Sequence, residues 1–190
     1  MVEIDASAAQ NAARRLERLP GAARRAINTA IRKSISGAKQ DAVRKVKERY
    51  TLRSVYITRT IKTYRTAFGA SIISRGRVND LAYFKTNPTR PPKRRPPKGK
   101  YLYSQVVKGE GGTIAHAFLA RMKSGHVGVF QRAGHGAGHA SLPIEKLAGP
   151  STPSMLGSPT VSAFIQKRMA ERVSGNLDHE VNAFLMGYRT

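Results

Sequence analysis

Three of the five histidines lie close together in the sequence, and imidazole is a common metal ligand. His126, His135 and His139 fall within fourteen residues, and the last two have the i,i+4 spacing of a ligand pair on a helix. However, the stretch around them is rich in glycine and is not expected to form a helix, and Glu145 is the one carboxylate near it. Natural metal sites need three or four converging ligands with supporting contacts. We therefore predict no metal site and interpret these histidines as residues of a loop.

Nucleophilic or acid–base catalysis would need a nucleophile beside a base, or a pair of acids. The central region holds three acids, Asp80, Glu110 and Glu145, which are far apart in the sequence and belong to no recognisable motif. The sequence has no G-x-S-x-G motif and no P-loop, and the glycines of residues 109–112 are too few to indicate a nucleotide site. The absence of cysteine excludes disulfides, thiolate catalysis and cysteine-bound zinc. We predict that the protein is not an enzyme and has no cofactor.

The strongest chemical feature is an excess of positive charge. The chain of 190 residues has 34 Lys and Arg against 11 Asp and Glu, a formal net charge of +23. Residues 1–108 hold 26 of the basic and 6 of the acidic residues, whereas residues 109–190 hold 8 and 5. Such a protein does not attract cationic partners, and at low salt it binds polyanions whether or not that is its function. The expected partners are therefore DNA or acidic protein surfaces.

The densest basic segment is also rich in proline. Residues 87–100 read NPTRPPKRRPPKGK, with five prolines and six basic residues in fourteen positions. Proline disfavours a helix or a central strand here, so we expect an extended loop that protrudes. It is either a disordered hairpin tip or a basic finger that lies on phosphate or on an acidic neighbouring subunit. The residues predicted to contact a polyanion are Arg90, Lys93, Arg94, Arg95, Lys98 and Lys100.

Further candidates lie on a long helix that is predicted over residues 21–49. Its apolar residues recur every three or four positions and form one stripe. They are Ala23, Ile27, Ile31, Ile35, Ala38, Ala42, Val46 and Tyr50. The other side is basic and nearly free of acids, so it is either a solvated face or a second polyanion surface. The candidate contacts are Lys39, Arg44, Lys45 and Lys47. No zinc-finger, RRM or KH signature is present in the sequence. Any DNA binding would therefore be to the phosphate backbone of the DNA, without recognition of bases.

The periodicity elsewhere indicates both helices and strands. Helices are predicted over residues 6–19, 52–61 and 160–187. The apolar stripe of the last helix consists of Val161, Phe164, Ile165, Met169, Val173, Leu177, Val181 and Phe184. Strands or extended pieces are predicted over residues 66–75, 80–86, 101–108, 113–122 and 126–132. Turns are predicted at Gly111-Gly112 and at Lys123-Ser124-Gly125, and an irregular connection over residues 142–159. We predict an α+β fold with a small antiparallel β-sheet flanked by long N-terminal and C-terminal helices.

The length suits a single domain over residues 1–190, from which residues 87–100 protrude. The N-terminus lacks the apolar core of a secretory signal, and no stretch approaches the ~18 apolar residues of a membrane-spanning helix. We therefore expect a soluble, cytosolic protein without a membrane partner.

The segment over residues 117–161 carries a resemblance to a known family. It contains AFLARMKSGHVGVFQRAG and SLPIEKLAGPSTPSMLGSPTV, with a Ser124-Gly125-His126 turn and a Gly128-Val129-Phe130 strand ending at Arg132. Leu142-Pro143-Ile144 and a Gly-Pro-Ser-x-Pro-x-Met stretch from Gly149 to Met155 follow. The chain resembles the minor tail protein Z, or tail completion, family of tailed phages and prophages. The basic helix and the short helix after it also look like the family, whereas the insert at residues 87–100 is longer than the family predicts.

The resemblance implies a structural protein of the virion that acts at the head-proximal end of the tail and makes tails competent to join heads. It implies a homo-oligomeric ring, with a hexamer favoured, other tail and neck proteins as partners, and assembly in the bacterial cytoplasm. The excess of positive charge separately suits non-specific contact with packaged DNA or with acidic neighbouring proteins. It supplies no catalytic residues. Loops on rigid scaffolds commonly carry contacts, so we predict a subunit interface on the proline-rich connection, with core packing as the alternative. Its residues are Leu142, Pro143, Ile144, Pro150, Pro153 and Met155. The competing function is that of a non-specific, basic DNA-binding protein.

Overall fold

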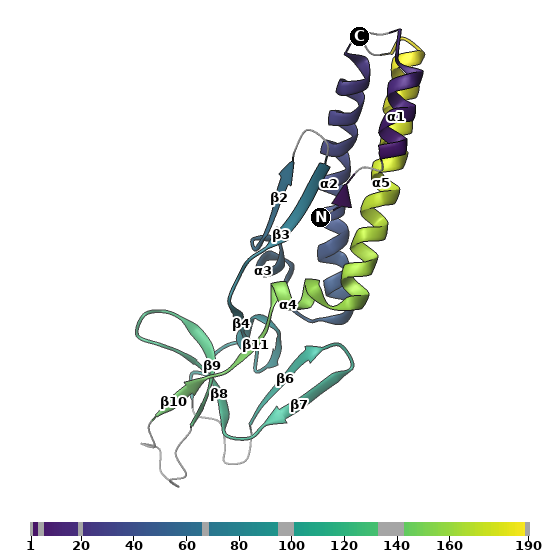
Figure 1. Ribbon diagram of the computed structural model, residues 1–190. Helices are drawn as coiled ribbons and strands as arrows, with labels where there is room; N and C mark the ends of the chain where they lie inside the picture. Colours follow the sequence, from purple (N-terminus) through teal and green to yellow (C-terminus); the bar gives the residue numbers. More distant parts are fainter. Residues whose placement is uncertain are drawn as a thin grey trace. The chain divides into compact units, whose positions relative to one another are not determined.

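A computed structural model describes residues 2–3, 6–18, 21–65, 69–94, 101–132 and 143–188 of the chain (Figure 1). The chain divides into two compact units. Unit 1 consists of Met1–Lys45, Thr58–Arg75 and Leu156–Thr190, and unit 2 of Val46–Ile57 and Gly76–Met155. Helices and small antiparallel sheets are combined, so the predicted α+β class is confirmed. The strands form four small sheets in the described part of the chain, where one sheet was expected.

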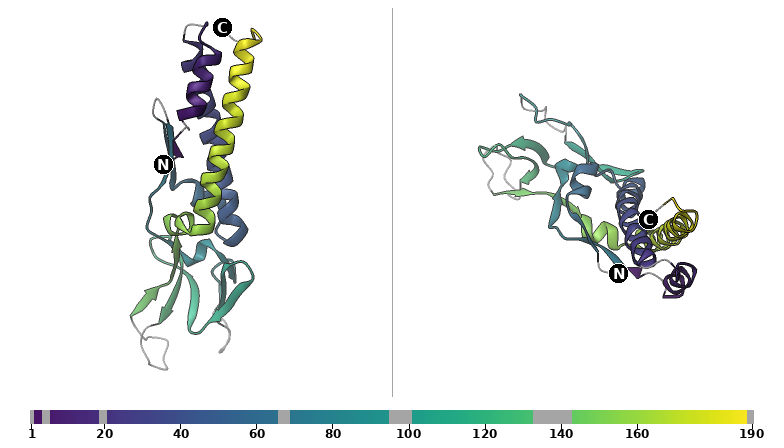
Figure 2. Two further views of the ribbon diagram at one scale, coloured as in Figure 1. Left: turned by 45° about the vertical axis from the view of Figure 1, so that its right-hand side comes forward. Right: turned by 90° about the horizontal axis from the view of Figure 1, so that it is seen from above.

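Unit 1 is built around three helices, α1 (Ala6–Arg15), α2 (Ala22–Arg49, of which residues 22–45 belong to this unit) and α5 (Pro159–Leu185). They lie side by side in both views of Figure 2. Small alanine side chains of α2 allow close approach of Leu177, Val181 and Phe184 on α5. The buried cluster comprises Ala12, Leu16, Ala22, Ala26, Ala30, Leu177, Val181 and Phe184.

The three helices correspond closely to the predicted ranges, but the buried stripe of α2 is wider than expected. Ala22, Ala26 and Ala30 are buried, whereas the predicted Ala23 and Ile27 are partly exposed. Helix α5 begins with Pro159 at its first turn, as predicted, because proline lacks the N–H that has no partner there.

A three-stranded sheet completes unit 1, with the order β1 (Val2–Glu3), β3 (Gly69–Ser74) and β2 (Ile61–Arg65). Ala70 and Ile72 of β3 pack against Ile31 and Ile35 of α2, so β3 covers one side of this helix. Strand β3 was predicted. The helix predicted over residues 52–61 is wrong at its end, because α3 covers only Ser54–Thr58 and Ile61 already starts β2.

Unit 2 contains three small antiparallel sheets. One has the order β5 (Lys85–Asn87), β6 (Leu102–Val107) and β7 (Glu110–Ile114). Another has the order β10 (Ile144–Lys146), β9 (Val127–Arg132) and β8 (Ala117–Arg121). The third pairs β11 (Ala148–Ser151) with β4 (Val78–Asp80). The 3-10 helix η1 (Leu81–Tyr83) and the short helix α4 (Thr152–Gly157) follow β4 and β11 directly.

The hairpin of β8 and β9 confirms the predicted pairing, and Gly125 supplies the positive φ of its turn. The turn predicted at Gly111-Gly112 is wrong. The chain reverses at Lys108-Gly109, where Gly109 has a φ of 84°, and both later glycines lie in β7. The strand predicted over residues 113–122 is interrupted by a turn at residues 115–116, and the extended piece over residues 80–86 is interrupted by η1.

The connection over residues 142–159 is more regular than predicted, since it contains β10, β11 and α4. Its prolines are placed where they cost no ladder hydrogen bond. Pro150 lies at the register shift between Gly149 and Ser151, and Pro153 lies in the first turn of α4. Proline content therefore marked the breaks between short elements.

Candidate functional site

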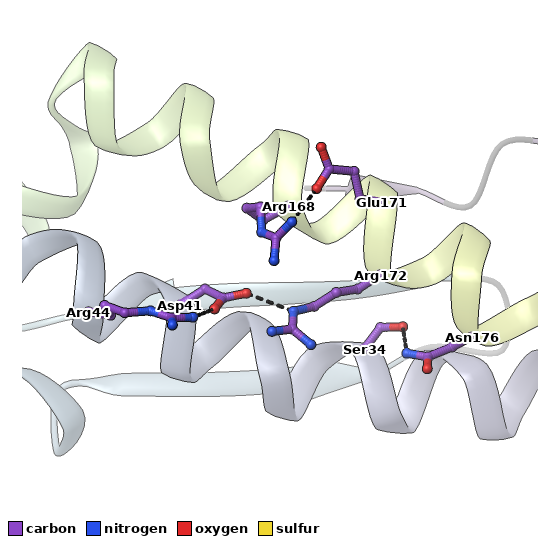
Figure 3. A network of polar contacts seen from close by, with 7 residues as sticks. All are labelled: Ser34, Asp41, Arg44, Arg168, Glu171, Arg172 and Asn176. Carbon is purple, nitrogen blue, oxygen red and sulfur yellow. Dashed lines mark hydrogen bonds and ion pairs between the residues drawn. The ribbon is translucent and has the colours of Figure 1, made fainter.

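Helices α2 and α5 are joined by a row of polar contacts, which Figure 3 shows in part. At one end of this row lies Asp41, whose side chain is 1% exposed. Its Oδ2 accepts a hydrogen bond of 2.7 Å from Arg172 Nε, and its Oδ1 accepts one from Arg44. The bond from the Arg172 guanidinium lowers the pKa of the Asp41 carboxyl, and the Arg44 contact adds to this, while burial opposes it. The same bond raises the pKa of Arg172. Asp41 is therefore held as a buried carboxylate.

Two further contacts continue this row along the antiparallel helices. Asn176 Nδ2 donates to Ser34 Oγ at 2.9 Å, and Lys33 Nζ lies 2.6 Å from Glu180 Oε1. Glu180 is fully buried. We call this set the α2–α5 seam. It consists of Lys33, Ser34 and Asp41 on α2 and Arg172, Asn176 and Glu180 on α5.

The seam depends on a glycine inside helix α2. A Cβ at Gly37 would lie 2.6 Å from Nη1 and 2.8 Å from Cζ of Arg172, closer than real Cβ contacts. Glycine in a helix costs roughly 1 kcal/mol relative to alanine. Here it lets the Arg172 guanidinium pass over α2 and reach Asp41. Because a buried ion pair adds little net stability but is costly to break, the seam is best understood as fixing the register of the two helices.

Contacts within the chain engage part of the basic side of α2 that was predicted to contact a polyanion. Lys39 Nζ donates to the carbonyl oxygen of Ile61 at 3.0 Å, Arg44 bonds to Asp41, and Lys45 Nζ lies 4.7 Å above the ring of Phe164. Lys47 is exposed. Three of these four cations thus have contacts within the chain, and their role with a polyanion stays a prediction.

The proline-rich basic segment begins at the end of β5. Arg90, Lys93 and Arg94 are exposed, and no ion pair joins them to a carboxylate in the described part of the chain. The other three predicted contacts, Arg95, Lys98 and Lys100, lie outside the described residues. The segment's extended, protruding form stays a prediction as well.

His126 lies against an acid instead of joining other histidines in the described residues. Its Nε2 is 2.9 Å from Oδ2 of Asp80, and Lys146 Nζ is also 2.9 Å from that oxygen. Asp80 Oδ1 accepts from the backbone N–H of Ala82. Asp80 is buried and connects β4 with β10 and with the turn that precedes β9, so the Ser-Gly-His turn places a partner beside it. The described residues contain no group of three metal-ligating side chains, and His135 and His139 lie outside them.

The segment predicted to form a subunit interface is mixed in exposure. Pro143 is exposed, Ile144, Pro150 and Pro153 are half-buried, and Leu142 lies outside the described residues. Met155 is 0% exposed, so in the isolated chain it packs in the interior. The interface role of the others stays a prediction.

The structure also exposes an apolar end of α5 that the sequence analysis did not single out. Leu185, Met186 and Tyr188 are 50%, 69% and 81% exposed. Their neighbour Phe184 is buried and ends the predicted apolar stripe of α5. Apolar character alone therefore does not distinguish this buried residue from the exposed ones that follow it. Large exposed apolar side chains that lie together commonly mark a contact surface.

A family model for prophage minor tail protein Z (GPZ) matches residues 7–189, nearly the whole chain. Searches of curated proteins and of solved structures found no match. In the part of the chain that the structure describes, none of the helices is long and apolar enough to cross a membrane.

Proposed function

The chain belongs to the prophage minor tail protein Z family, and we propose that it completes the head-proximal end of the phage tail for joining to heads. Family membership makes it a structural protein of the phage tail, with other tail proteins as partners. The observation that carries the proposal is the match over residues 7–189, which includes both long helices and the segment from β8 to α5. Its location is then the tail or neck of the virion, after assembly in the bacterial cytoplasm. A purely structural role requires no catalytic group and no cofactor.

A ring of identical subunits, with six the favoured number, is part of the proposal. Two surfaces support contacts between neighbours. One is the connection over residues 142–159, in which Pro143 is exposed. The other is the apolar end of α5 with Leu185 and Met186. Exposed apolar side chains become buried when a stable interface forms. A seam that fixes the register of α2 and α5 also suits a subunit that must present the apolar end of α5 in one geometry.

The test uses phage particles made without the chain. Heads and tails are assembled separately from a prophage in which the gene is deleted, and joining is counted by electron microscopy and by infectious titre. The expected result is that tails form without the chain but do not join heads, and that purified protein restores joining. Tails that join heads normally without the chain would overturn the proposal, and so would protein that never associates with tails.

The apolar end can be tested in the same assay. Leu185→Glu with Met186→Glu should reduce joining at least tenfold, because two charges would have to be buried at a contact. The matched control is Gln166→Glu with Ser174→Glu, which adds the same charge at two exposed positions of α5. Equal activity of the two double variants would show that this end makes no contact. Native mass measurement of the wild-type protein on and off tails gives the subunit number.

Non-specific DNA binding is the second candidate function, and the observation that favours it is the group of exposed cations after β5. The two functions are compatible if the basic surface faces DNA that passes through the joint.

A further inference from the structure

One face of the β5–β6–β7 sheet combines tyrosines with polar and basic side chains. Lys85 of β5 lies opposite Gln105 of β6, and Asn87 lies opposite Tyr103, which in turn lies opposite Thr113 of β7. Residues that face each other across antiparallel strands share one face of the sheet. The intervening residues Thr86, Leu102 and Ser104 are buried, so they define the inner face. The outer face therefore carries Lys85, Asn87, Tyr103, Gln105 and Thr113.

Tyr103 lies across this outer face. A Cβ at Gly111 would overlap its hydroxyl, so glycine at this position makes room for the tyrosine on β7. Tyr101, two residues earlier, is 39% exposed and its ring is 5.1 Å from that of the exposed His116. The strand registers place both tyrosines at the end of the sheet where Asn87 leads into the basic segment.

Positive charge is concentrated along β5 and the segment that follows it. Lys85 is exposed on β5, and Arg90, Lys93 and Arg94 follow Asn87 within seven residues. The exposed acid of this sheet, Glu110, pairs with Val107 at the opposite end of β6. Among the described residues, no ion pair joins any of these four cations to a carboxylate. We call this surface the β6 face. It consists of Lys85, Asn87, Tyr101, Tyr103, Gln105 and Thr113, with Arg90, Lys93 and Arg94 of the segment that leaves it.

We propose that the β6 face binds the phosphodiester backbone of double-stranded DNA without reading its sequence. Lys, Arg, Tyr, Asn, Gln and Thr are among the side chains that donate hydrogen bonds to phosphate and sugar oxygens of DNA. A protein partner would favour an apolar centre, whereas DNA interfaces are polar and strongly positive. On the described part of the β6 face, Tyr101 is the one large apolar side chain that is prominently exposed. The composition thus favours DNA over an acidic protein surface.

The inference rests on the second candidate function, non-specific DNA binding, and gives it a surface. It is independent of the proposed role in joining heads to tails, since it concerns the isolated protein. If both hold, this face is the one that meets DNA at the head–tail joint.

The test measures binding of the full-length protein to a labelled duplex by fluorescence anisotropy over a series of salt concentrations. In a plot of the logarithm of the binding constant against the logarithm of the salt concentration, each phosphate contact adds about 0.9 to the steepness of the slope. The quadruple variant Lys85→Ala, Arg90→Ala, Lys93→Ala, Arg94→Ala should lower the steepness by about 3 to 4. The matched control is Lys62→Ala, Arg65→Ala, Arg121→Ala, Lys123→Ala, which removes the same charge from exposed positions of β2 and the β8–β9 hairpin. Its steepness should change by less than about 1.

Tyr103→Phe tests the contribution of an uncharged side chain, because it removes a hydroxyl group and leaves the net charge unchanged. Loss of an uncharged donor should weaken duplex binding several-fold while leaving the salt dependence unchanged, because no counterion release is lost. Circular dichroism confirms that each variant is folded.

Equal losses in the two quadruple variants would overturn the proposal, because binding would then follow net charge and not this face. Equal affinity for poly-glutamate and for DNA at matched charge would also overturn it, in favour of an acidic protein partner. Undetectable duplex binding by the wild-type protein at low salt would do so directly, and would leave the role in joining heads and tails untouched.

Discussion

Units 1 and 2 carry almost the same net charge but use it in different ways. Unit 1 has 18 basic and 7 acidic residues, and unit 2 has 16 and 4, so their net charges are +11 and +12. In unit 1, the buried carboxylates of Asp41 and Glu180 draw basic side chains into contacts between helices. In unit 2, Asp80 is the one buried acid among the described residues, and Arg90, Lys93 and Arg94 stay at the surface.

The comparison teaches that the number of cations does not locate a binding surface. What decides is how many of them are engaged by acids, carbonyl groups and rings of the same chain. By that criterion the proline-rich basic segment over residues 87–100 is a better candidate for polyanion contact than the basic side of α2.

The largest expected effect concerns the buried pair of unit 1. Arg172→Met leaves the Asp41 carboxylate buried with Arg44 as its remaining ionic partner, and should lower the free energy of unfolding by about 3 kcal/mol. Arg168→Met is the matched control one turn earlier, because its pair with Glu171 is exposed and should contribute less than about 1 kcal/mol. Urea denaturation followed by circular dichroism measures both. Equal losses would mean that the seam is no different from a surface ion pair.

A glycine comparison tests the close approach of the two helices. Gly37→Ala should destabilise the protein by about 2 kcal/mol, because its Cβ displaces the Arg172 guanidinium. Gly175→Ala on α5 meets open space and should stabilise it by roughly 0.5 to 1 kcal/mol through helix propensity. Thermal denaturation of the two variants should therefore shift in opposite directions, and a rise for both would contradict the packing over Gly37.

The corresponding change in unit 2 should be milder. Lys146→Met removes one partner of Asp80, but His126 and the N–H of Ala82 remain, and the Lys146 side chain is 47% exposed. We expect a loss of about 1 kcal/mol in urea denaturation. A loss as large as that of Arg172→Met would remove the contrast between the two units.

The smallest expected effect is a dependence of stability on pH. The pKa of Asp41 is lowered in the folded protein, so its contribution is complete above the pKa of an unfolded Asp, about 3.9, and is lost as pH falls through the lowered value. Between pH 5 and pH 3 the wild-type protein should lose more unfolding free energy than Arg172→Met loses. Parallel curves for the two proteins would show that Arg172 does not set this pKa.

The long helices and several strands were predictable from the sequence because they depend on the local spacing of apolar residues. Helices α2 and α5 follow from apolar residues recurring every three or four positions. Strand β3 follows from a β-branched run bounded by Gly76, and the β8–β9 hairpin from two apolar segments joined by a short loop with Gly125. Strand β2 was missed because residues 62–65 are exposed at the edge of its sheet, which leaves no alternation to detect. The short elements of residues 142–159 were missed because their prolines lie at a bulge and a helix start.

The sequence by itself determined the fold class, the family resemblance, the absence of thiol chemistry and the excess of positive charge, because these depend on composition and local pattern. Only the tertiary structure decided which charges are engaged. Asp41 and Arg172 are 131 residues apart, and Asp80 of β4 contacts His126 in the turn before β9 and Lys146 in β10. Such pairings depend on chain topology and burial. The spacing of residues along the sequence does not indicate which basic side chain will lie beside a buried acid.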